Sequence, residues 1–104
     1  METAISLLQK WYVRHCDGDW EHSYGVKIDT LDNPGWILTV DLADTEFSDS
    51  SLPRSRVDRS EDDWIQFEVS GQRYIACGGV FNLEEMILQF LDFSGDRGSE
   101  RIQD

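Results

Sequence analysis

Apolar residues recur at helical spacing near the beginning of the chain. The segment 3–15 has an apolar residue at every third or fourth position, which predicts an amphipathic helix. Thr3 is the expected N-cap, and Gly18 is expected to break the helix. The predicted apolar face consists of Ile5, Leu8, Trp11 and Tyr12, with Leu7 beside it.

A second helix is predicted near the end of the chain, where the same spacing returns. Asn82 and Glu85 stand at the separation of a capping box, with Asn in place of the usual Ser or Thr, and Gly95 is expected to end the helix. The predicted apolar face consists of Leu83, Met86, Ile87, Phe90 and Leu91.

Between the two helical segments, apolar and polar residues alternate, as they do in strands with one buried side. Alternation predicts strands over 24–29, 36–42 and 64–69. A further strand is predicted over 73–77, although its pattern does not show which side faces inward. A short strand over 54–58 would bring the number to five.

The connections between the predicted strands decide the fold class. DNPG at 32–35 and Ser70-Gly71 are turn sequences, and the acidic, Ser-rich stretch 43–51 is predicted to be a loop. Short connections join antiparallel neighbours, since a parallel crossover needs a dozen or more residues. We therefore expect one α+β domain over 1–95, with four to five antiparallel strands and both helices packed on one face, and a polar tail over 96–104.

The charge of the chain restricts the partners that it can bind. Twenty-one acidic residues against nine basic ones give a net charge of −12. Nucleic acid and anionic membrane surfaces are poor partners, since each would repel such a protein. A basic protein would be attracted to it, although an acidic composition also serves plain solubility.

The cysteines and the N-terminal residues indicate a cytoplasmic protein. Cys16 and Cys77 do not form a C-x-x-C pair, so we expect two reduced thiols. METAISLLQKWYV has no basic region and only a short, interrupted apolar stretch. We therefore expect neither a secretion signal nor a membrane span.

The stretch HCDGDWEHSY, residues 15–24, suggests a metal site at first sight. An EF-hand loop that starts at Asp17 fails, because His22 and Ile28 occupy the positions that require Gly and an acid. A zinc site lacks paired C-x-x-C or H-x-x-x-H ligands. A metal-dependent hydrolase that uses the His15–His22 segment is therefore only an alternative, and we expect no cofactor.

Covalent catalysis has no clear motif either. Cys16 next to His15 or His22 is a conceivable pair, whereas Cys77 in the apolar run YIAC is expected to be a buried, small apolar residue. Gly78-Gly79 has neither the Lys of a phosphate-binding loop nor the spacing of a dinucleotide fingerprint. A binding protein is favoured over an enzyme.

Aromatic residues among acids are typical of a surface that binds a basic protein. Trp11 and Trp36 fall on apolar faces and are expected in the core, whereas Trp20 and Trp64 can be either core residues or exposed anchors. The predicted binding surface consists of Asp17, Asp19, Trp20, Glu21, His22, Tyr24, Asp32, Asp62, Asp63 and Trp64.

Several ordered blocks of the chain, LQKWY, CDGDWEHSYG, LDNPGW, RSEDDW and GGVFNLEE, resemble the immunity protein 53 family of bacterial polymorphic-toxin systems. The resemblance runs from about Leu8 to Phe93. It implies a non-enzymatic protein that binds and neutralises a cognate toxin inside the cell. From the charge we expect this toxin to be basic, with a nuclease as one candidate. An acidic adaptor domain without a toxin partner is a further alternative.

Overall fold

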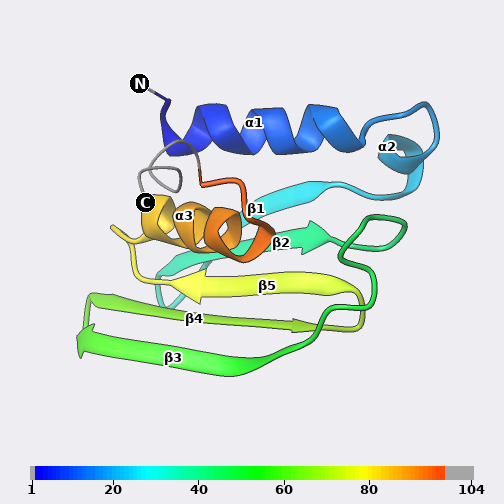
Figure 1. Ribbon diagram of the computed structural model, residues 1–104. Coiled ribbons are helices and arrows are strands. Elements are labelled where there is room, and N and C mark those ends of the chain that lie inside the picture. The colour runs from blue at the N-terminus through cyan, green and yellow to red at the C-terminus, as the bar shows by residue number, and fades with distance from the viewer. Residues whose placement is uncertain (1, 98–104) are drawn as a thin grey trace, which may run out of the picture.

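The computed structural model describes residues 2–97, which form two layers: a five-stranded antiparallel sheet and helices on one of its faces (Figure 1). This arrangement confirms the predicted α+β class. The elements in chain order are α1 (Ala4–His15), α2 (Trp20–Ser23), β1 (Val26–Leu31), β2 (Gly35–Asp41), β3 (Leu52–Ser60), β4 (Asp63–Ser70), β5 (Arg73–Gly78) and α3 (Leu83–Ser94).

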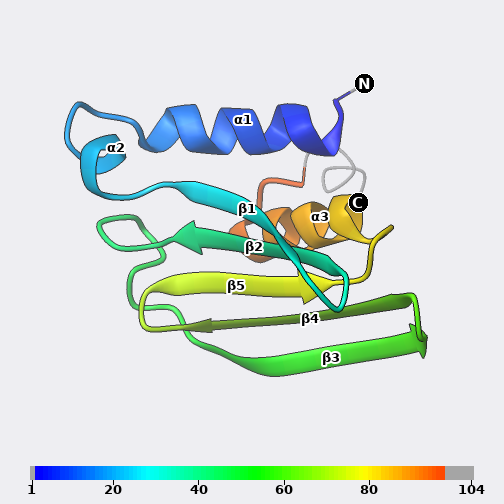
Figure 2. The same cartoon turned by 180° about the vertical axis from the view of Figure 1, so that it is seen from behind.

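The strands lie in the order β1-β2-β5-β4-β3, and every neighbouring pair is antiparallel (Figures 1 and 2). Tight turns join β1 to β2, β3 to β4 and β4 to β5. The predicted loop over 43–51 carries the chain from β2 to the far edge of the sheet, so that β5 pairs between β2 and β4. The central strand is therefore the last strand in the sequence, while β1 and β3 form the edges.

The strands at the two edges differ most from their sequence patterns. The strand predicted over 54–58 is longer, Leu52–Ser60, and every residue after Leu52 is exposed. It lacks apolar alternation because neither side is covered, and its order comes from backbone pairing with β4. On β1, the predicted apolar side is only partly covered: Val26 packs against the core, whereas Ile28 is 41% exposed.

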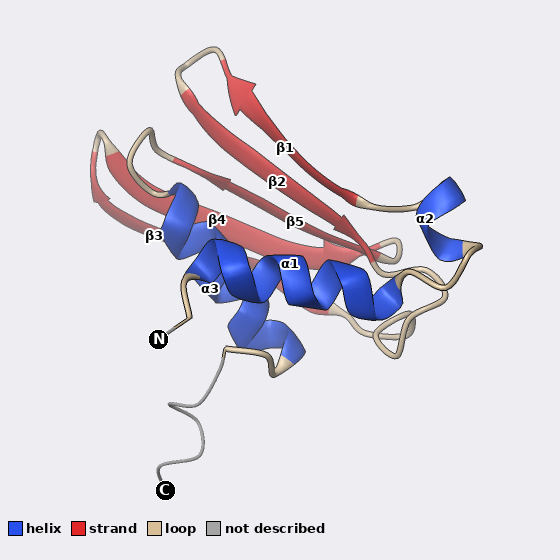
Figure 3. Ribbon diagram, turned by 90° about the horizontal axis from the view of Figure 1, so that it is seen from above, coloured by secondary structure: helices blue, strands red, loops and turns tan. Residues whose placement is uncertain are grey.

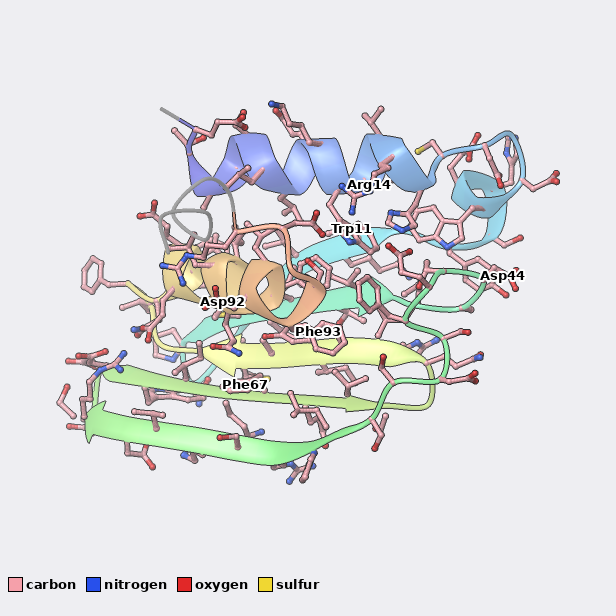
Figure 4. All side chains as sticks on the ribbon, viewed as in Figure 1. Trp11, Arg14, Asp44, Phe67, Asp92 and Phe93 are labelled. Atoms are coloured by element: carbon pink, nitrogen blue, oxygen red, sulfur yellow. The ribbon has the colours of Figure 1, made fainter. Side chains whose placement is uncertain are left out.

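The core lies between the sheet and the helices, with α3 over β5 and β2 and with α1 packed against α3 (Figure 3). The inward side of β5, which the sequence pattern left open, carries Tyr74 and Ala76. The Phe90 ring packs edge-on against Trp11, with 5.0 Å between centroids, and against Tyr74, at 5.1 Å. Trp11 and Phe93 both lie between the helical layer and the sheet (Figure 4).

The first helix has the predicted bounds, but its buried stripe is rotated. Thr3 Oγ1 accepts the Ser6 N–H at 3.0 Å, as the N-cap prediction requires. Ala4 is buried together with the expected Leu8 and Trp11, whereas Ile5 is 51% exposed and Tyr12 is also exposed. The predicted face was therefore wrong at these positions, because α1 packs against α3 and needs only a narrow stripe.

The ends of the helices are only partly as predicted. Helix α1 ends at His15, three residues before Gly18, whose φ of +95° instead shapes the following turn. At α3 the predicted capping box does not form, since the Asn82 side chain makes no cap hydrogen bond. Gly95 ends α3 with a left-handed φ of 81°, as predicted. The predicted tail over 96–104 lies outside the described residues, except for its first two residues.

Candidate functional site

The residues of the predicted binding surface lie at opposite ends of the sheet. Residues 17–24, called here the α2 end, adjoin the end of β2, where the Trp20 indole N–H donates to the Ala43 carbonyl at 2.9 Å. The turns 32–34, 61–64 and 79–81 meet at the other end, called here the turn end, where the Gly79 N–H donates to the Trp64 carbonyl at 3.1 Å. The structure thus separates the predicted surface into two groups.

At the α2 end, Trp20 belongs to the core. Its side chain is only 4% exposed and packs edge-on against Trp11, with ring centroids 6.0 Å apart. Tyr12 and the half-buried Tyr24 flank the same ring at 6.1 and 6.2 Å. Of the two roles that the sequence left open for Trp20, the structure shows the core role.

Two of the acids at the α2 end hold the backbone of the loop. The Asp17 carboxylate accepts the N–H groups of Asp19 and Trp20, both at 3.0 Å, and the Glu21 carboxylate accepts those of Asp17 and Gly18, both at 2.9 Å. The N–H groups of Trp20 and Asp19 lower the pKa of Asp17. The pKa of Glu21 is lowered by its own N–H and by those of Asp17 and Gly18. These carboxylates hold the loop that leads from α1 into the short helix α2.

The remaining residues of the α2 end are more accessible. Asp19 and His22 are exposed, and their side chains form no hydrogen bond or ion pair with any described residue. Tyr24 lines a hollow of about 270 Å³ together with Lys27 and Arg73, whose charge is partly offset by Asp41 at 3.3 Å. The hollow at this end is therefore lined by both signs of charge.

The His15 and Cys16 side chains of this segment both have hydrogen-bond partners within the chain. His15 Nδ1 lies 2.9 Å from the Trp11 carbonyl and Nε2 lies 2.7 Å from Glu46, so both ring nitrogens have partners. The Cys16 thiol donates to the Tyr12 carbonyl at 3.3 Å. Within residues 2–97, no group of three or more His, Cys, Asp or Glu side chains is placed to hold a metal ion.

The second cysteine lies elsewhere in the sheet. Cys77 points to the face without helices and is only half-buried, so the prediction of a fully buried residue was wrong. Burial still raises the pKa of its thiol, which disfavours a reactive thiolate. Both cysteines are free thiols.

At the turn end, Asn82 and Asp63 join three elements. Asn82 is buried, and its Nδ2 donates to Asp63 at 2.9 Å and to Glu85 at 3.0 Å. Arg59 pairs with both carboxylates, at 2.9 Å and 2.6 Å. Arg59 first, and Asn82 second, lower the pKa of Asp63. This network ties the β3–β4 turn to the start of α3.

The half-buried Trp64 ring lies on the helix-free face, beneath Arg56. The guanidinium carbon is 4.5 Å from the ring centroid, and Arg56 Nε donates to Asp58 at 2.8 Å. These three residues, with Glu61 and Asp62, line a hollow of about 410 Å³. Asp32 is exposed in the adjoining turn.

Val80 and Phe81, the apolar pair of GGVFN, were not among the predicted surface residues. Both side chains are exposed, and the Val80 carbonyl accepts the Trp36 indole N–H at 3.0 Å. Trp36, expected in the core, is half-buried and packs at its margin. The sequence places this apolar pair between a Gly-Gly turn and a helix start, and the structure shows that it is exposed.

The family model described as immunity protein 53 matches residues 5–95, so the chain belongs to that family. The match confirms the resemblance noted in the sequence. It supports immunity to a toxin as the role of the chain, with the toxin as its partner. Comparisons with curated proteins and with solved structures find no match. Within residues 2–97, no helix has the length and apolar character needed to cross a bilayer.

Proposed function

We propose that this chain is a non-enzymatic immunity protein that binds a basic toxin and blocks its action in the cytoplasm of the producing cell. The family match over residues 5–95 carries the proposal. The net charge of −12 favours a partner of opposite sign, and two free thiols fit a reducing compartment. Binding alone is then sufficient for protection.

The charge also suggests how binding would begin. A large field of one sign speeds the encounter with an oppositely charged surface, and salt screens that attraction. If the toxin is a nuclease, its cleft has to attract phosphates, and carboxylates can occupy the same basic surface. We therefore expect competition between this chain and the toxin's anionic substrate.

The accessible members of the predicted surface are the contacts that we propose. Asp19 and His22 are free for a partner at the α2 end, and Asp32 and Asp62 at the turn end, where Arg56 covers the half-buried Trp64 ring. The carboxylates of Asp17, Glu21 and Asp63 instead have structural partners within the chain. Trp20 lies in the interior.

The test is co-expression with the toxin domain encoded by the adjacent gene, followed by affinity measurements at low and high salt. We expect relief of growth arrest and a complex that salt weakens mainly through slower association. Asp19→Lys and Asp62→Lys probe one end each and serve as mutual controls, because neither carboxylate supports the fold. Failure to bind and to relieve arrest would refute the proposal, whereas binding unaffected by either variant would place the interface elsewhere.

A further inference from the structure

The turn between β5 and α3 carries the most exposed large apolar side chain of residues 2–97. Phe81 is 90% exposed, and its neighbour Val80 is 37% exposed. Moving a large apolar side chain out of water lowers the free energy, so a solvated phenylalanine is unfavourable in the isolated protein. Isolated exposed apolar residues are common, and the setting of this turn distinguishes it from them.

The backbone holds Phe81 away from the protein body. The Asn82 N–H donates to the Gly79 carbonyl at 3.1 Å, which places Val80 and Phe81 at the two central positions of a tight turn. The Gly79 N–H and the Val80 carbonyl are bonded to Trp64 and Trp36, at 3.1 and 3.0 Å. The turn is therefore fixed to β4 and β2 before any partner arrives.

Close packing beneath the turn adds to this rigidity. A Cβ atom on Gly79 would lie 2.5 Å from the Asp62 carbonyl oxygen and 2.8 Å from Asn82 Oδ1. The buried Asn82 is in turn held by Asp63 and Glu85. An aromatic side chain on a fixed backbone loses less conformational freedom on binding than one on a flexible loop, which favours it as an interface anchor.

Two hollows flank the turn, each of about 410 Å³. Val80 lines one of them and Phe81 the other. Each hollow is also lined by one arginine that is paired with a carboxylate: Arg56 with Asp58 at 2.8 Å, and Arg97 with Asp92 at 2.7 Å. Three other carboxylates of these hollows form no ion pair with any described residue, and they leave an excess of negative charge: Glu61, Asp62 and Glu84.

We infer that this turn with its two hollows is the surface that docks the toxin. Phe81 would enter an apolar socket on the toxin, and Lys or Arg side chains beside the socket would enter the hollows. The inference rests on the proposed function and specifies its site. A second copy of the chain is the less suitable occupant, because two such acidic surfaces repel each other.

The experiment compares the wild-type chain with Phe81→Ala in binding to the toxin domain encoded by the adjacent gene. For Phe81→Ala we expect a Kd that is roughly ten- to hundredfold higher at both salt concentrations, mostly because dissociation is faster. Val13→Ala is the matched control, since Val13 is 66% exposed on α1 and should leave Kd unchanged. Glu84→Lys should instead slow association, and only at low salt.

The outcomes separate the inference from the proposed function. If the wild-type chain binds no toxin, both fail. If it binds and Phe81→Ala, with wild-type thermal stability, binds equally well, only the docking surface is refuted. A wild-type dimer that Phe81→Asp dissociates in sedimentation analysis would also overturn the inference, since a second copy would then cover the turn.

Discussion

Replacing Trp20 with alanine tests whether the acidic segment around it is built on the core or on the surface. The indole is 4% exposed, lies among Trp11, Tyr12 and Tyr24, and donates to the Ala43 carbonyl at 2.9 Å. Truncation removes the aromatic packing and also leaves a carbonyl of the 43–51 loop without its donor.

The size of the effect follows from these contacts. Truncation of a buried aromatic residue to alanine costs about 3–5 kcal/mol, which is comparable to the whole free energy of unfolding of many small domains, about 5–15 kcal/mol. Trp20→Phe keeps a six-membered aromatic ring but loses the N–H donor and part of the packing, so we expect a smaller cost of about 1–2 kcal/mol.

Urea unfolding followed by far-ultraviolet circular dichroism measures these differences. Val13→Ala is the control, because an exposed position should change the free energy of unfolding by only about 0.5 kcal/mol. If Trp20→Ala lost less than about 1 kcal/mol, the ring would not be buried as described, and its role as a surface anchor would be open again.

Three further predictions concern stability. The folded-state pKa values of Asp17 and Glu21 lie below their ordinary values of 3.8 and 4.5. The stability that these carboxylates contribute is therefore present above those values and is lost as the pH falls below them. Thermal melts between about pH 6 and pH 3 should show this loss, and Asp17→Asn should make it smaller. Tyr74 has a buried hydroxyl without a partner in the described residues, so Tyr74→Phe should raise the free energy of unfolding by about 1 kcal/mol, and a fall would reveal a missing partner. Gly79→Ala should lower it by about 1–3 kcal/mol in urea unfolding, because the added methyl meets the Asp62 backbone; a variant as stable as the wild type would contradict the rigid turn.

The sequence by itself determined the elements whose burial follows their own periodicity. The alternation over 36–42 predicted β2 with one buried side, which Leu38 and Val40 occupy, and the helical spacing after Asn82 predicted the buried side of α3. Both elements line the core between the two layers, so one side of each is buried and its apolar pattern is complete. The family blocks likewise predicted the class of protein without any structure.

Only the tertiary structure decided features that depend on what lies opposite a residue. Edge strand β3 is ordered by backbone pairing, which leaves little trace in the side-chain pattern. Trp20 and Phe81 are both aromatic residues near glycines and acids, yet one is buried and the other is 90% exposed. The physical reason is that burial is a property of pairs of surfaces: side chains of α1 and Tyr24 cover Trp20, whereas the bonded turn of Gly79 and Asn82 holds Phe81 in solvent.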